Sequence, residues 1–186
     1  MRQNCYTMDI CRTDSRVVLG GVCKRYRKAG KFLQAFAENN TIAIEKGFND
    51  YLWNTISICD ISVKKEMKEN FYHGILLRLL AYMDGWLVKS NAESGEGYSD
   101  ISIEIRQRET GIIIELKYAE NGTFDAGCQE ALKQIKDRRY ENILIDNGMR
   151  TIYQYGIACY KKRCKVVPET VVIKNYISGQ KDYGKE

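Results

Sequence analysis

An uninterrupted apolar run near the middle of the chain constrains the fold more than any other feature. Residues 111–116 read Gly-Ile-Ile-Ile-Glu-Leu, with no alternation between apolar and polar positions. Such a run is typical of a strand covered on both faces, which requires helices on both sides of a sheet. Before it, Ile101, Ile103 and Ile105 alternate with polar residues, which predicts a half-buried strand. Residues 109–111 then predict a hairpin turn between the two strands.

Helical periodicity dominates the segments before these strands. Apolar residues recur at helix spacing over residues 28–38, 41–56 and 63–83, and a further helix is predicted at about 125–140. Short strands are predicted at 86–88 and 152–160, and residues 164–167 are expected to pair with the latter. This order predicts an α/β fold, with a mixed central β-sheet flanked by helices and an N-terminal helical extension.

The length of 186 residues fits one domain of about 150 residues with an extension. We expect a poorly patterned N-terminal arm over residues 1–27 and a helical extension over 28–62. The core is expected over 63–186, with an uncertain tail after Pro168. The aromatic residues from Phe32 to Phe36 and from Phe48 to Trp53 are expected to fill the core between the extra helices and the sheet.

Several protein classes are excluded by what the sequence lacks. Its apolar runs are far shorter than the roughly 20 residues of a membrane helix, and its N-terminus has no apolar signal region, so we expect a cytoplasmic protein without membrane contact. The seven cysteines are odd in number and include no Cys-x-x-Cys pair, which favours free thiols over disulfides or a zinc ribbon.

The common nucleotide and hydrolase motifs are also missing. The sequence has no P-loop, no dinucleotide fingerprint and no Gly-x-Ser-x-Gly elbow, so no nucleotide cofactor is expected. The net charge of +5 permits a nucleic-acid partner without requiring one. Positive charge gathers in three runs, at residues 24–31, 133–139 and 161–165, each of which a solvated surface would also explain.

A charged constellation spans the two predicted strands. Asp100 opens the alternating strand, and Glu115 and Lys117 follow after fourteen intervening residues, at the end of the apolar run. Residues two apart on a strand point to the same face, and a hairpin can bring Asp100 beside them. Because charge is costly to bury, such residues need a partner or a task.

Two converging carboxylates suit a hard divalent cation. Mg²⁺ commonly takes one or two protein carboxylates and completes its shell with water and phosphate oxygens. A neighbouring lysine can orient or activate the attacking water and offset charge on a phosphate. Asp100, Glu115 and Lys117 are therefore suited to phosphodiester hydrolysis, although spacing alone equally fits a cross-strand salt bridge.

Ser99-Asp100 followed by Glu115-x-Lys117 resembles the PD-(D/E)XK nuclease superfamily, with Ser in place of the common Pro. The sequence is also similar to the nuclease domain at the C-terminus of many bacterial proteins that carry an N-terminal AAA-ATPase-like domain. That similarity covers about residues 30–167. Its motifs are Phe71-Tyr72-His73-Gly74, Ser90-Asn91-x-Glu93-Ser94-Gly95-x-Gly97, Ile113-Ile114-Glu115-Leu116-Lys117, Ala131-Leu132-x-Gln134-Ile135 with Tyr140, and Tyr155-Gly156-Ile157-Ala158.

The resemblance implies a restriction-endonuclease-like core and a Mg²⁺- or Mn²⁺-dependent nuclease. Asp100 and Glu115 would be metal ligands, Lys117 the catalytic lysine, and attack of a metal-bound water would leave a 5′-phosphate. His73 resembles a histidine that joins the metal shell in RecB-like nucleases, and Glu69, one helical turn earlier, is a second candidate.

The resemblance further implies a role for the region around α-helical residues 131–140. Gln134 and Tyr140 match a Gln-x(5)-Tyr element that positions the active site or DNA. The nucleic-acid contacts expected on this basis and on charge are Tyr140, Lys133, Arg138 and Tyr98. Without such a role, Gln134 and Tyr140 would simply be surface residues of a helix, and Tyr98 would be an exposed tyrosine in a turn.

Departures from the family pattern leave alternatives open. Tyr98 stands where relatives carry Arg, and the closely spaced cysteines of iron–sulfur relatives are lacking, so no iron–sulfur cluster is expected. The expected partner is DNA, with RNA as the alternative. An ATPase domain or another protein is a further candidate partner, and the chain could form a dimer. The alternatives to a nuclease are an inactive nucleic-acid- or protein-binding module, or the C-terminal part of a larger ATPase-linked protein.

Overall fold

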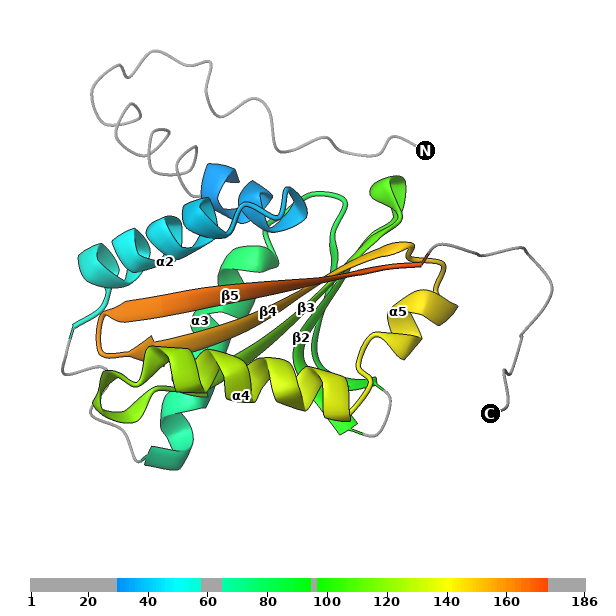
Figure 1. Cartoon of the computed structure of the whole chain (residues 1–186). Coiled ribbons are helices and arrows are strands. Elements are labelled where there is room, and N and C mark those ends of the chain that lie inside the picture. The colour runs from blue at the N-terminus through cyan, green and yellow to red at the C-terminus, as the bar shows by residue number, and fades with distance from the viewer. Residues whose placement is uncertain (1–29, 58–64, 95–96, 174–186) are drawn as a thin grey trace, which may run out of the picture.

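The computed structural model describes residues 30–57, 65–94 and 97–173 of the chain. Within these ranges a single five-stranded sheet has helices against both of its faces (Figure 1). The helices are residues 30–37, α2 (Thr41–Thr55), α3 (Lys65–Leu80), α4 (Phe124–Asp137) and α5 (Asn142–Asp146). The strands are β1 (Leu87–Ser94), β2 (Gly97–Ile105), β3 (Thr110–Tyr118), β4 (Thr151–Tyr160) and β5 (Arg163–Val172). The predicted arm, residues 1–27, lies outside the described residues.

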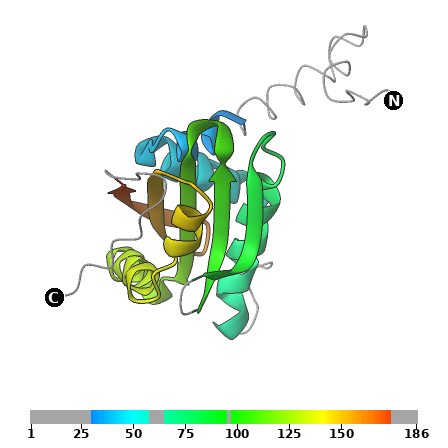
Figure 2. The same cartoon turned by 90° about the vertical axis from the view of Figure 1, so that its right-hand side faces the viewer.

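The sheet is mixed and has β3 at its centre. The strand order is β1-β2-β3-β4-β5; β3 and β4 are parallel, and the other neighbours are antiparallel. Residues 110–116 of β3 are all buried, as the apolar run predicts. Figure 2 shows α4 and α5 on one side of the sheet and α3 on the other. A mixed sheet with helices on both faces is therefore confirmed.

The first helices and the sheet share one hydrophobic core. Phe36, Phe48 and Leu76, from residues 30–37, α2 and α3, are fully buried with Ile101 and Ile114 from the sheet. The Tyr155 hydroxyl, on β4, donates to the Phe36 carbonyl oxygen at 2.9 Å. The predicted helical extension thus packs directly on one face of the sheet. Trp53 was wrongly expected in this core, because it is 66% exposed at the end of α2.

α4 lies unusually close to the opposite face because small residues separate it from β4. A Cβ atom on Gly156 would lie only 2.3 Å from the Cys128 carbonyl oxygen, and one on Gly127 would lie 3.0 Å from the Ala158 Cβ. Gly156 pairs in register with Glu115 across β3 and β4. The close approach therefore fixes α4 directly over the part of β3 that carries Glu115.

Polar side chains of α2 cover the outer edge of β5. Glu45 Oε2 accepts from the Val166 N–H at 3.0 Å, and Asn49 Oδ1 accepts from the Cys164 N–H at 2.8 Å. An uncovered edge would offer free backbone groups to another chain. Because β5 is an edge strand, it also tolerates Pro168, which has no N–H to donate.

Four predicted boundaries were wrong. The turn predicted at 109–111 is formed by residues 106–109 instead, because Thr110 and Gly111 already pair with β2 in β3. β1 extends to Ser94 rather than ending at Val88, because its polar residues pair with β2 without an apolar signal. β5 continues past Pro168 to Val172, where we expected an uncertain tail. The helix predicted at 125–140 ends at Asp137. The separate α5 was not predicted, because its five residues are too few to show a periodic pattern.

Candidate active site at the separation of β2 and β3

The two predicted carboxylates lie where β2 and β3 separate. The register between these strands ends at the pair Ile101 and Ile114. Beyond that pair, side chains replace the backbone ladder: Asp100 Oδ2 accepts from the Leu116 N–H at 2.8 Å, and Glu115 Oε2 lies 3.4 Å from the Asp100 N–H. Asp100 and Glu115 are thus held against each other by the geometry of the strand ends.

α3, on the face of the sheet opposite α4, places Glu69 and His73 beside the separation of β2 and β3. Glu69 Oε1 accepts from the Tyr118 N–H at 3.0 Å, so a second carboxylate substitutes for a strand partner along β3. His73 Nε2 lies 2.9 Å from the Asp100 carbonyl oxygen and 3.2 Å from Ser90 Oγ. A carbonyl oxygen only accepts, so Nε2 carries the proton and His73 holds the backbone of Asp100 in this arrangement.

Lys117 lies among the carboxylates with its side chain only 14% exposed. Its Nζ is 3.5 Å from Glu115 Oε1 and 4.0 Å from Glu69 Oε2. Burial acts to lower the pKa of Lys117, but the nearby carboxylates, Glu115 foremost, outweigh burial and raise that pKa above its ordinary value. The lysine therefore stays positively charged at neutral pH.

Both carboxyl groups resist ionisation in the metal-free protein. Burial and the neighbouring charge of Asp100 raise the pKa of Glu115 to about 8. Burial also raises the pKa of Asp100, and this effect is only partly offset by the Leu116 N–H and by His73. Two buried carboxylates that repel each other gain most from a positive charge placed between them.

Gln134 reaches Glu115 from α4. Its Nε2 donates to Glu115 Oε1 and lies 3.3 Å from the Tyr140 hydroxyl. Tyr140 is only 2% exposed and packs in the core beneath α4 and α5. Its hydroxyl thus reaches Gln134 from within the core, and its contact with nucleic acid stays a prediction.

A divalent cation fits the chemistry of this pair. Across the described ranges, no group of three or more His, Cys, Asp and Glu side chains is assembled as a metal site. Mg²⁺, however, needs only one or two protein carboxylates, with water and phosphate oxygens completing its shell. Asp100 and Glu115 supply that number, and their mutual repulsion is the electrostatic condition that a cation relieves.

The other predicted nucleic-acid contacts are Lys133, Arg138 and Tyr98. Lys133 and Arg138 are exposed, on α4 and at its C-terminal end, while Gln134 between them points to Glu115. Tyr98 belongs to β2, but its side chain lies outside the described part. Of the three basic runs, 133–139 and 161–165 are described, whereas the run at 24–31 is described only from residue 30 onward.

The sequence did not reveal how backbone groups complete the site. The N–H groups of Leu116 and Tyr118 hold Asp100 and Glu69, and no residue pattern signals that a backbone group has lost its strand partner. The contact between Ser90 and His73 was also missed. The signals that α3 contributes to this site were the resemblance of His73 to a metal-shell histidine and the helical spacing of Glu69 and His73.

The chain matches a known protein family. A family model described as the PD-(D/E)XK nuclease superfamily matches residues 67–169, which is more than half of the chain. That range contains Glu69, His73, Asp100, Glu115, Lys117, Gln134 and Tyr140. The mixed sheet flanked by helices agrees with the restriction-endonuclease-like fold expected for this superfamily. No curated protein matches the chain, and none of the described helices has the length and apolar character needed to cross a membrane.

Proposed function

The chain belongs to the PD-(D/E)XK nuclease superfamily, and from this premise we propose that it is a divalent-metal-dependent nuclease that hydrolyses DNA. Nuclease chemistry, and with it metal-dependent phosphodiester hydrolysis, is the general property of the superfamily. The observation that carries the proposal for this chain is the convergence of Asp100, Glu115 and Lys117 where β2 and β3 separate. Asp100 and Glu115 repel each other and burial raises the pKa of both, an arrangement that a bound cation would stabilise.

Asp100 and Glu115 would hold the metal, with Mg²⁺ or Mn²⁺ as the candidates. A bound divalent cation would supply positive charge that activates the attacking water and offsets charge on the phosphate. Glu69 lies close enough to Lys117 to join the same charge network. His73, the third predicted ligand, would have to exchange its contact with the Asp100 carbonyl oxygen to bind a metal.

Lys117 acts in this proposal through its positive charge. Since the carboxylates raise its pKa, the ammonium group has no free lone pair at neutral pH and donates hydrogen bonds rather than accepting a proton. It is positioned to orient the attacking water or to stabilise the negative charge that develops on phosphate oxygens. Its burial strengthens this effect, because less solvent screens the charge.

Gln134 and Tyr140 act as positioning residues. The Gln134 amide donates to Glu115 Oε1, and the same amide nitrogen lies 3.3 Å from the Tyr140 hydroxyl. Fixing one carboxylate oxygen leaves the orientation of Glu115 defined before a substrate arrives, which lowers the cost of ordering the site. α4 is fixed in turn by its close approach to Gly156.

Cleavage of labelled single- and double-stranded DNA and RNA tests the proposal. The wild type would be assayed in Mg²⁺, in Mn²⁺ and with EDTA, beside Asp100→Ala and Lys117→Ala. Asp137→Ala, an exposed carboxylate at the end of α4, is the control. We expect metal-dependent cutting of DNA that Asp100→Ala and Lys117→Ala abolish and the control retains. A folded wild type that cuts no substrate, or an Asp100→Ala variant that still cuts, would overturn the proposal.

A further inference from the structure

Aromatic rings paired with lysines occupy the end of the sheet beside the candidate active site. The rings of Tyr118 and Tyr160, from the neighbouring ends of β3 and β4, have centroids 5.7 Å apart. Lys68 Nζ lies 4.5 Å from the centroid of Tyr118, and Lys161 Nζ lies 5.2 Å from that of Tyr160. Both rings are only partly buried, so this group is not part of a closed core.

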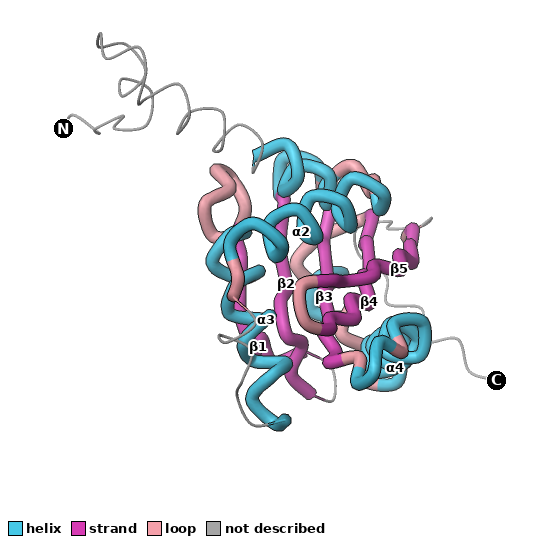
Figure 3. Tube along the Cα trace, turned by 90° about the vertical axis from the view of Figure 1, so that its left-hand side faces the viewer, coloured by secondary structure: helices cyan, strands magenta, loops and turns pink. Residues whose placement is uncertain are grey.

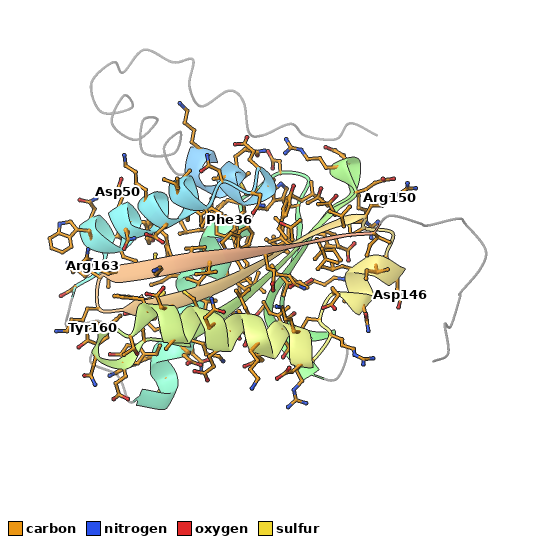
Figure 4. The ribbon with its side chains drawn as sticks, in the orientation of Figure 1. Phe36, Asp50, Asp146, Arg150, Tyr160 and Arg163 are labelled. Atoms are coloured by element: carbon orange, nitrogen blue, oxygen red, sulfur yellow. The ribbon has the colours of Figure 1, made fainter. Side chains whose placement is uncertain are left out.

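A third pair extends the group across the β4–β5 hairpin. Trp53, at the end of α2, is 66% exposed, and Lys162 Nζ lies 5.6 Å from its ring centroid. Lys162 also donates to the Trp53 carbonyl oxygen at 3.3 Å. We call Lys68, Tyr118, Tyr160, Lys161, Lys162 and Trp53 the aromatic–lysine surface. Figure 4 places Tyr160 and Arg163 at this end of the sheet, away from Asp146 and Arg150, and Figure 3 shows this end toward the viewer.

The backbone that carries this surface is connected to the candidate site. Tyr118 follows Lys117 directly, and its N–H donates to Glu69, the neighbour of Lys68 on α3. The Tyr72 hydroxyl, also on α3, donates to the Lys161 carbonyl oxygen at 2.7 Å and so fixes the hairpin. Tyr118 and Lys117 point to opposite faces of β3, but Lys117 Nζ lies 4.0 Å from Glu69 Oε2, so the lysine reaches the α3 side where β2 and β3 have separated. A nucleic-acid strand bound on the surface would therefore meet Lys117 through this separation.

The chemistry of the surface fits one class of ligand. Exposed bases stack on aromatic rings whatever their sequence, and lysines neutralise the phosphates between them. The bases of a duplex are stacked on one another and cannot meet Tyr118, Tyr160 or Trp53. A duplex would thus use only the lysines, whereas an unpaired strand would use the rings as well.

We propose that the aromatic–lysine surface binds the unpaired bases of a single-stranded nucleic-acid segment and leads its backbone to the site at Glu115. The proposal rests on the proposed function, since the bound strand is the one to be cut. It narrows the substrate to a nucleic acid with a single-stranded part. The lysines that now lie over the rings are flexible enough to turn toward phosphates when bases take their place.

Binding measured without cleavage tests this surface separately from catalysis. Fluorescence anisotropy would follow a labelled oligothymidylate and a blunt duplex of equal length, in EDTA, with the wild type, Tyr160→Leu and Lys161→Ala. Tyr82→Leu is the matched control, because Tyr82 is 61% exposed and has Arg78 4.3 Å from its ring centroid at the opposite end of α3. Tyr160→Leu keeps an apolar side chain, and Lys161 is exposed, so both variants are expected to fold.

We expect Tyr160→Leu to weaken single-strand binding by about tenfold and to leave duplex binding unchanged. Lys161→Ala should lower the salt dependence of single-strand binding by roughly 0.7 in the logarithmic slope. Tyr82→Leu should bind as the wild type does. Unchanged single-strand binding by Tyr160→Leu, or an equal loss on the duplex, would overturn the assignment.

The binding and cleavage results separate the two proposals. A wild type that binds single strands through Tyr160 but cuts nothing in Mg²⁺ would support the surface and contradict the proposed function. A wild type that cuts DNA while Tyr160→Leu binds single strands normally would contradict the surface alone.

Discussion

Two glutamates on adjacent strands are equally buried but lie in opposite electrostatic environments. Glu104 on β2 and Glu115 on β3 are each 2% exposed, and each is flanked in the sequence by large aliphatic residues. Each also pairs in register with a glycine: Glu104 with Gly111 and Glu115 with Gly156. The two therefore form a matched pair within one sheet.

Glu104 is surrounded by groups that favour its charge. Lys89 Nζ lies 3.1 Å from its Oε1, the Arg106 guanidinium lies 3.3 Å from its Oε2, and Asn147 Nδ2 donates to Oε1 at 2.8 Å. Burial alone would raise the pKa of Glu104, but these partners together lower it. Glu104 is thus a satisfied buried carboxylate that stabilises the fold.

Glu115 faces another carboxylate instead. Asp100 raises its pKa, together with burial, and Lys117 offsets only part of that effect. A protein that needed only stability would not keep two buried acids in contact. The comparison shows that burial does not distinguish the two glutamates, whereas the charge of the groups around them does.

The largest difference should appear in catalysis. We expect Glu115→Gln to reduce the rate of metal-dependent DNA cleavage by about 10³-fold or more, since several kcal/mol of metal-derived stabilisation would be lost. Glu104→Gln should keep the wild-type rate at a temperature where it is folded. Rates measured at saturating Mg²⁺ check both variants. Similar losses in the two variants would remove the functional distinction between them.

The glycines opposite the two glutamates should also differ. A Cβ on Gly156 would meet backbone, the Cys128 carbonyl oxygen at 2.3 Å, whereas a Cβ on Gly111 would meet the Leu144 Cδ1 atom at 2.8 Å, which can move. We expect Gly156→Ala to lower the free energy of unfolding by about 3 kcal/mol and Gly111→Ala by about 1 kcal/mol. Urea unfolding measures both, and a reversed order would contradict the close packing of α4.

Glu104→Gln should destabilise the protein by about 2 kcal/mol at pH 7, because it removes charge-assisted hydrogen bonds. The loss stays below that of a fully buried ion pair, since Lys89 and Arg106 are 43% and 73% exposed and can return to water. Since the pKa of Glu104 is lowered by folding, its contribution is present above the ordinary value of 4.5 and is lost as pH falls. Denaturation curves at pH 7 and at acid pH test this, and an unchanged midpoint at pH 7 would contradict it.

Glu115→Gln should stabilise the protein in metal-free buffer, whereas Glu104→Gln destabilises it. This is the smallest of the expected effects. The pKa of Glu115 rises on folding from 4.5 to about 8, so between these values the folded protein holds a proton that the unfolded chain has released. The wild type therefore loses stability as pH rises through that window. Burial and the Asp100 carboxylate oppose the charge of this group and outweigh the groups that favour it, which are Lys117, the Asp100 N–H and the Gln134 amide. We expect Glu115→Gln to be more stable than the wild type by about 1 kcal/mol at pH 8 and equal to it below pH 4.5.

Denaturation in EDTA across this range, with Glu104→Gln as the comparison, measures that difference. A Glu115→Gln variant that is less stable than the wild type at pH 8 would show that Glu115 serves the fold, as Glu104 does.

The sequence was sufficient to predict the central strand and the convergence of Asp100, Glu115 and Lys117 beside it. The apolar run predicted β3, and the strand period placed Glu115 and Lys117 on one face. Apolar patterning alone does not separate Glu115 from Glu104, because Ile-Glu-Leu and Ile-Glu-Ile look alike; only the motif of Asp100 with Glu115-x-Lys117 singled out Glu115. The surroundings that make the two glutamates differ are Asp100 beside Glu115 and, beside Glu104, Lys89, Arg106 and Asn147. Only tertiary contacts carry that information.

Other features depended on contacts between distant segments. The close approach of α4 requires Gly156 and Cys128 to meet, and the exposure of Trp53 depends on where α2 ends relative to the β4–β5 hairpin. Ser99, which stands where the superfamily commonly has Pro, is fully buried with a hydroxyl that has no partner among the described residues. The sequence alone shows only that Ser stands in place of Pro. The buried surroundings of Ser99 show that an apolar residue would suit this position.

Metal binding by the two glutamate variants is the most direct test of whether Asp100 and Glu115 hold the metal. Calorimetric titration of Mn²⁺ into the wild type, Glu115→Gln and Glu104→Gln requires neither a substrate nor a cleavage assay. We expect the wild type and Glu104→Gln to bind Mn²⁺ with the same affinity and Glu115→Gln not to bind it. Equal binding by all three proteins, or loss of binding in Glu104→Gln alone, would contradict the assignment of Asp100 and Glu115 as the metal-holding pair.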